Sequence, residues 1–124
     1  GTARLAAERA SGEDIARLRL TIAQQRAAIP DFERFLERDM EFHRGIAAIS
    51  GNPIFSSIVE ATFHWASEYY QPLVRAPGAE ELTLAEHERI VDAIAAHDTD
   101  AAAAAMHAHL SRANQLYSQL IRKD

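Results

Sequence analysis

The sequence predicts an all-α fold, an antiparallel bundle of about six helices. Apolar residues recur three and four positions apart, which is the spacing of a helix and not of a strand. Proline and glycine divide the chain into pieces of helix length, and capping residues stand at the starts of several pieces. With 124 residues, 48% of them hydrophobic, the chain can bury one core, so we expect a single domain over residues 1–124.

The expected helices follow one another with short connections. Counted from the capping residue where there is one, they cover Thr2–Ala10, Ser11–Ile29, Phe32–Ile49, Asn52–Gln71, Thr83–Ala96 and Asp98–Arg122. Ser11 with Asp14 three residues later is a typical helix start. Pro30-Asp31 interrupts the second helix, and Gly51 can adopt the left-handed conformation that ends the third.

The second half of the chain has its own start signals. Asn52-Pro53 supplies a cap and a first-turn proline for the fourth helix. The segment Pro72–Leu82 is the one long connection. Thr83 with Glu86 has the pattern of a capping box, so the fifth helix is expected from Leu84. Asp98 caps the last helix, whose alanine-rich start favours helix strongly.

Composition excludes several classes of protein. There are no cysteines, so disulfides and thiolate metal sites are excluded. No apolar run approaches the roughly 20 residues of a membrane span, and the first residues lack the apolar core of a secretory signal, so a cytoplasmic protein is expected. The net charge is −5 and the basic residues are scattered, unlike a DNA-binding surface. Gly1 leads directly into helix-forming sequence, so we expect a fragment of a longer protein.

Four polar residues fall on apolar helix faces. Asp39 and His43 lie on the apolar stripe of the third helix, His87 on that of the fifth and His109 on that of the sixth. The other histidines are expected in solvent: His64, His97 and His107.

A shared metal ion would satisfy all four polar groups, whereas burying each unpaired costs about 1–3 kcal/mol or more. Asp39 and His43 lie one helical turn apart, a usual spacing for two ligands of one ion. Imidazole and carboxylate suit one divalent transition metal, with zinc the first expectation and nickel, manganese or iron also suitable. The alternative is that each histidine is a core residue hydrogen-bonded to a carbonyl, and that Asp39 and His43 form a hydrogen bond with each other.

The chain resembles the FCD family, the C-terminal effector domain of FadR-type GntR transcription regulators. Three segments carry the resemblance: LAAERASGEDIARL, DMEFHRGIAAISGNPIF and EHERIVDAIAAHDTDAAAAAMHAHL. The family's D-x-x-x-H pair and two later histidines correspond here to Asp39, His43, His87 and His109. The short helix count is similar to the VanR-type branch, and the acyl-CoA-binding branch lacks this quartet.

The resemblance implies a metal at the floor of a cavity, where a small carboxylate or sugar acid binds beside or on it. It also implies a homodimer that does not bind a membrane. DNA would be bound only through an N-terminal winged helix-turn-helix domain absent from this chain. Within the cavity, Arg44 and Asn52 are the candidate effector-binding residues, although Asn52 also suits a helix cap. No catalytic residue is expected.

Two other readings stay open. The first is a metal-dependent hydrolase, since an open metal position can activate water, and His97-Asp98 is similar to the motif of HD phosphohydrolases. No general base stands out beyond the ligands, however. The second is a structural or dimerisation bundle whose histidines bind no metal. Such a bundle would keep its melting temperature in chelator.

Overall fold

The described part of the protein consists of helices and short connections. The computed structural model describes residues 1–55, 57, 58, 60, 61, 64 and 78–122, with side chains up to residue 112. Its helices are α1 (Thr2–Arg9), α2 (Gly12–Ala27), α3 (Phe32–Ser50), α6 (Ala79–Ala95) and α7 (Thr99–Arg122), and residues 53–55, 57, 58, 60, 61 and 64 are also helical. No strand occurs in these residues, and their helices include none with the length and hydropathy of a membrane span. The predicted all-α bundle is confirmed.

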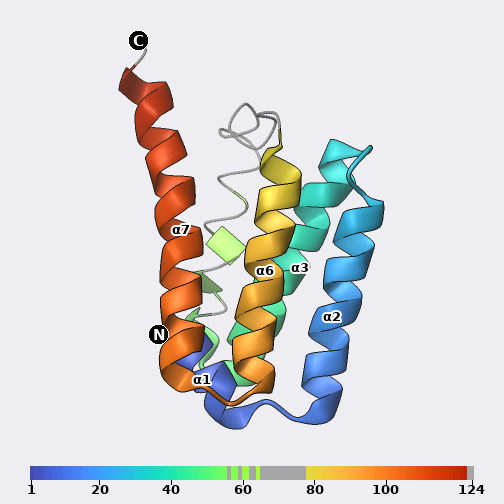
Figure 1. Ribbon diagram of the computed structural model, residues 1–124, viewed down its shortest axis with the longest axis vertical. Coiled ribbons are helices and arrows are strands. Elements are labelled where there is room, and N and C mark those ends of the chain that lie inside the picture. Colours follow the sequence, from blue (N-terminus) through green and yellow to red (C-terminus); the bar gives the residue numbers. More distant parts are fainter. Residues whose placement is uncertain (56, 59, 62–63, 65–77, 123–124) are drawn as a thin grey trace.

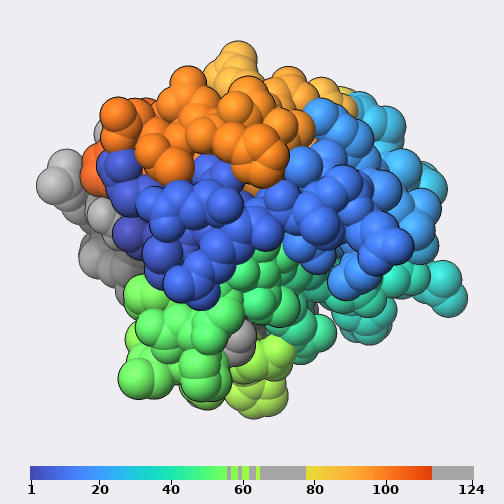
Figure 2. All heavy atoms as spheres, turned by 90° about the horizontal axis from the view of Figure 1, so that it is seen from below, coloured from blue at the N-terminus to red at the C-terminus, as the bar shows by residue number. Residues whose placement is uncertain are grey.

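Helices α2, α3, α6 and α7 run along the long axis of the molecule (Figure 1). Helix α2 is antiparallel to α3, α6 is antiparallel to α7, and α2 also packs on α6. The short α1 contacts α3, α6 and α7. Seen from below, α1 lies across one end of the bundle, between the start of α7 and the residues that follow α3 (Figure 2). The largest buried apolar side chains between these helices are Phe35, Phe42, Ile46, Leu84, Ile90 and Ile94.

Most of the expected helix caps are present. Ser11 Oγ accepts from the backbone N–H of Asp14, and Asp14 Oδ2 accepts from the N–H of Ser11, which completes a capping box at α2. Asp98 Oδ1 accepts from the N–H of Ala101 at the start of α7. After α3, Gly51 takes the left-handed conformation with φ 76°.

The predicted start of the fifth helix is wrong. Helix α6 begins at Ala79, after Gly78 with φ 78°, and no side chain caps it. Thr83 and Glu86 lie inside the helix, so they form no capping box. Acidic residues in the first turn favour this earlier start because they complement the partial positive charge of the helix N-terminus. Most of the expected Pro72–Leu82 connection and the end of the helix predicted to Gln71 lie outside the described residues.

Polar contacts join helix α1 to two of its neighbours, α3 and α7. Arg9 Nη1 donates to the carbonyl of Ser50, the last residue of α3, at 2.6 Å. Arg4 Nη1 pairs with Asp100 Oδ1 in the first turn of α7, also at 2.6 Å. These contacts join α1 to both α3 and α7.

Candidate metal centre

Three buried imidazoles from three helices meet in the core. His43 on α3, His87 on α6 and His109 on α7 are 6%, 0% and 6% exposed. Each offers one ligand atom, and these atoms all lie within 4.8 Å of one another. The rings of His43 and His109 are stacked, with centroids 5.5 Å apart, and His87 meets both edge-on. One ion could therefore be in reach of all three side chains.

Asp39, the fourth expected ligand, lies at the edge of this cluster. Its side chain is 14% exposed, and its Oδ1 lies 3.3 Å from Nε2 of His87. The same oxygen accepts a hydrogen bond from Nε2 of Gln25 at 3.2 Å. The carboxylate thus adjoins the histidines through His87.

One atom of the cluster has no hydrogen-bond partner. Within the described part of the chain, Nε2 of His87 is the buried side-chain nitrogen or oxygen left unpaired. Phe42 covers the flat face of the same ring, with centroids 4.0 Å apart and planes 11° from parallel. Leaving a buried polar atom unpaired costs about 1–3 kcal/mol. A metal ion would give this nitrogen a partner, so the residues present fit a bound metal.

A carboxylate on the neighbouring helix α6 orients the ring of His109. Glu86 Oε1 lies 2.7 Å from Nδ1 of His109, and both oxygens of Glu86 accept from Nε of Arg112 at 2.8 Å. Arg112 also donates to the hydroxyl of Thr83. Metal-bound histidines usually donate their other ring N–H to such a group. Sequence reasoning missed Glu86 in this role because its spacing from Thr83 suggested a cap.

Gln25 takes the corresponding place beside His87. This residue of α2 is fully buried, and its Oε1 lies 3.0 Å from Nδ1 of His87. It was also missed, although the signal was present: Gln25 continues the buried stripe of Leu18 and Ile22 at helical spacing. A polar residue on that stripe marks the site as the histidines do.

Burial dominates the electrostatics of the cluster. It lowers the pKa of His43 to about 3 and, with the neighbouring His43 and His109, holds the pKa of His87 well below its usual value. Burial also raises the pKa of Asp39 to about 6, against the lowering effects of His109, Gln25 and Arg112. The imidazoles of His43 and His87 are therefore neutral near pH 7, which is the form that binds metal.

The remaining expected residues have partners elsewhere. Arg44 is exposed and pairs with Glu60. Asn52 Oδ1 accepts from the N–H of Ile54 at 2.9 Å, which agrees with its reading as a helix cap. As expected, the histidines away from the cluster are exposed: His64, His97 and His107.

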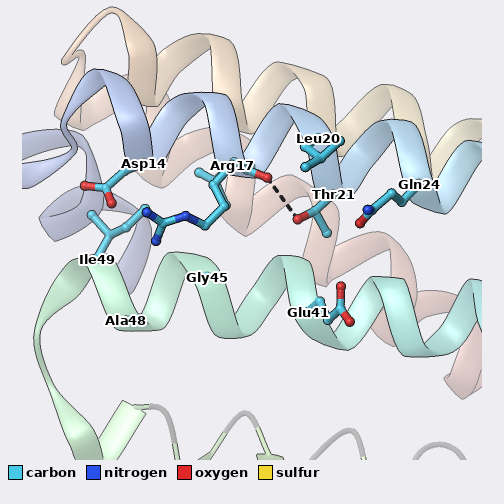
Figure 3. Close-up of a pocket in the computed structure, with 10 residues that line it drawn as sticks. Asp14, Arg17, Leu20, Thr21, Gln24, Glu41, Gly45, Ala48 and Ile49 are labelled. Carbon is cyan, nitrogen blue, oxygen red and sulfur yellow. Dashed lines mark hydrogen bonds between the residues drawn. The ribbon is translucent and has the colours of Figure 1, made fainter.

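A separate groove of about 590 Å³ lies between α2 and α3. Figure 3 shows Arg17 reaching from α2 towards α3 inside it, with Thr21 bonded to the carbonyl of Arg17. None of the four expected metal ligands lines the groove, and neither Arg44 nor Asn52 does. The groove is therefore distinct from the histidine cluster.

The proteins to which this chain is similar agree with its helical fold and with the expected transcription regulator. The family model described as the FCD domain matches residues 1–112. Two relatives, each named an HTH-type transcriptional repressor NanR, come from Cronobacter sakazakii and Salmonella schwarzengrund. They are 34% and 35% identical to the chain, covering 97% of it and 47% and 46% of their own length. The chain thus spans about half the length of these curated relatives.

The solved structure of E. coli McbR/YncC has the same fold, with a TM-score of 0.74 at 20% identity over 96% of this chain and 58% of that one. The two named relatives are transcriptional repressors, which agrees with the expected regulator and not with the hydrolase alternative. His97 instead contacts the carbonyl of Ala7 through Nδ1, and Asp98 caps α7.

Proposed function

The chain belongs to the FCD domain family, and we propose that it is the effector-sensing and dimerisation domain of a GntR-type transcription regulator that uses a bound metal ion. The named relatives are transcriptional repressors that match along nearly the whole chain. We propose that residues 1–124 form this one domain, that DNA is bound by an N-terminal domain outside this chain, and that the regulator acts as a cytoplasmic homodimer.

The proposed ligands are His43, His87, His109 and Asp39, which would hold one divalent transition metal. The observation that carries this proposal is the meeting of three buried imidazoles whose ligand atoms lie within 4.8 Å of one another. The unpartnered Nε2 of His87 supports it. Zinc suits three imidazoles and a carboxylate best, and nickel, manganese or iron also accept this donor set.

The proposed effector is a small carboxylate or sugar acid. A bound metal would supply a Lewis-acid position for its carboxylate. Arg112 adds positive charge beside the cluster, close enough to lower the pKa of Asp39. Arg44 and Asn52 remain proposed effector contacts, and each would have to exchange its partner, Glu60 or the Ile54 N–H, to make them.

Effector binding would reach the DNA-binding domain by shifting the population of two states. Helix α3 carries two of the proposed ligands and α7 carries one, and these helices contact α1 through Arg9 and Arg4 respectively. A change in the spacing of these two helices would therefore move α1, which lies at the start of the chain.

Elemental analysis of the purified chain, before and after chelation, tests the metal site. We expect about one equivalent of transition metal per chain, and none in the variant His43→Ala His87→Ala. The matched control, His64→Ala His107→Ala, replaces two exposed histidines and should keep the metal. A wild-type chain that holds no metal, and takes up none when Zn²⁺, Ni²⁺ or Mn²⁺ is added, would refute the site.

A further inference from the structure

The geometry points to Gln25 as the residue that positions two ligands of the metal site at once, by fixing the tautomer of His87 and holding the carboxylate of Asp39. This inference rests on the proposed metal function. Gln25 is fully buried on α2, a helix that supplies none of the proposed ligands. Its side chain is the link through which α2 joins the centre.

The hydrogen bonds of Gln25 can be oriented in only one way around an ionised Asp39. A carboxylate that binds metal is ionised and only accepts hydrogen bonds, whereas a glutamine amide has one donating and one accepting end. The NH₂ group of Gln25 must therefore face Asp39 Oδ1, 3.2 Å away. Its carbonyl oxygen then faces Nδ1 of His87 at 3.0 Å, as the structure has it.

That orientation determines where His87 carries its proton. Because the amide oxygen only accepts, Nδ1 must be the donor, and a neutral imidazole has only one N–H. Nε2 is left with a lone pair, and it is this atom that has no hydrogen-bond partner in the described structure. Asp39 Oδ1 lies 3.3 Å from it, so two electron-pair donors stand side by side.

Two such atoms in contact repel each other unless a cation binds both. Gln25 thus holds His87 in the tautomer, and both side chains in the orientation, that a metal requires, before any metal arrives. A glutamine that merely filled the core would neither fix the tautomer of His87 nor orient the carboxylate of Asp39. It could be replaced by an apolar side chain of similar length without loss of metal affinity.

Zinc affinity, measured by competition with a chromophoric chelator, tests this role. Gln25→Met has a similar length and lacks both the donor and the acceptor. By analogy with other outer partners of metal ligands, it should bind zinc about 10- to 100-fold more weakly. Gln24→Met is the matched control, because Gln24 is exposed on the same helix and should leave the affinity unchanged. Circular dichroism of each variant checks that the helices form.

The tautomer of His87 is a second readout, which a purely structural role would not fix. Nitrogen NMR of the metal-free wild type near neutral pH should show the proton on Nδ1 of His87. Gln25→Glu, which keeps an acceptor there, should preserve that signal, and Gln25→Met should lose it.

Two results would overturn the inference: equal zinc affinity in the wild type and Gln25→Met, or a proton on Nε2 of His87 in the wild type. If Gln25→Met fails to fold, the wild-type tautomer still decides. Failure of the wild type itself to bind zinc would refute the proposed function instead, and the control variant would fail with it.

Discussion

Nδ1 of His109 lies 2.7 Å from Oε1 of Glu86, so a carboxylate on α6 fixes the ring of a histidine on α7. With Nδ1 occupied in this way, Nε2 is the nitrogen of His109 available as a ligand. Burial opposes ionisation of Glu86, but hydrogen bonds from Arg112 and His109 outweigh it and hold the pKa of Glu86 below its usual value. Glu86 is therefore charged at neutral pH, which makes the imidazole a stronger donor.

Replacing Glu86 by glutamine should weaken the metal site. Glu86→Gln keeps an acceptor for His109 but removes the negative charge and leaves Arg112 without its ion-pair partner. We expect metal affinity to fall about 10- to 100-fold, as for other carboxylates that support a metal-bound histidine. Chelator competition measures it. The control Glu88→Gln changes an exposed pair with Arg26 and should have no effect; equal losses in both variants would contradict the role of Glu86.

Removing the metal should lower the melting temperature. A ligand that binds only the folded state, present at about 1,000 times its dissociation constant, adds about 4 kcal/mol to the free energy of unfolding. Scanning calorimetry with and without chelator should therefore show a melting temperature lower by roughly 10 °C or more in the wild type and unchanged in His43→Ala His87→Ala. An unchanged wild-type melting temperature would favour a bundle whose histidines are only structural.

The variant His87→Ala should lose both metal and effector binding while its helicity is largely kept. His87 is fully buried against Phe42, so the truncation also leaves a cavity and should destabilise the fold by about 2–5 kcal/mol. Isothermal titration with Zn²⁺ and then with candidate organic acids gives both affinities. Undiminished affinity for an organic acid that binds the wild type would separate the effector site from the metal.

Lowering the pH should destabilise the protein when a chelator keeps it free of metal. The pKa of His43 is lowered to about 3 and that of His87 lies well below 6.5, so below about pH 6.5 the unfolded chain binds protons that the folded chain does not. The part of the free energy of unfolding that depends on these two histidines is fully present above that pH and is lost as the pH falls. Asp39 acts in the opposite sense, because its pKa is raised to about 6 and its protonation between about pH 6 and 3.8 relieves a buried charge.

Two histidines outweigh one carboxylate, so urea unfolding in chelator should give a lower free energy of unfolding at about pH 5 than at about pH 7. Asp39→Asn removes the opposing contribution and should make the fall steeper. A free energy of unfolding that rises on acidification would show that the buried histidines do not control this range.

Gly51→Ala should destabilise the junction of α3 with α1. Gly51 has φ 76°, where a non-glycine residue costs roughly 1–2 kcal/mol, and an added Cβ would lie 2.8 Å from Nη1 of Arg9. The methyl group would also disturb the bond from Arg9 to the Ser50 carbonyl. Chemical denaturation measures the loss. Gly12→Ala, where nothing lies within 4 Å of the new methyl group, is the control and should not destabilise the protein.

The features that depend on neighbours along the chain could be predicted from the amino-acid sequence. Helix periodicity predicted the all-α class, and the caps at Ser11 and Asp98 form as expected because each involves residues within three positions. The same periodicity placed His43, His87 and His109 on inward faces, since a helix fixes which residues share a side.

The contacts between side chains of different helices could not be predicted in this way and came from the packed fold. Glu86 follows Thr83 at capping-box spacing. Because α6 packs against α7, however, both side chains accept hydrogen bonds from Arg112 instead. Gln25 lies 62 residues from His87, and no local pattern links them. Such contacts depend on the rotation and register of one helix against another, which the packing of the whole core sets and no single segment encodes.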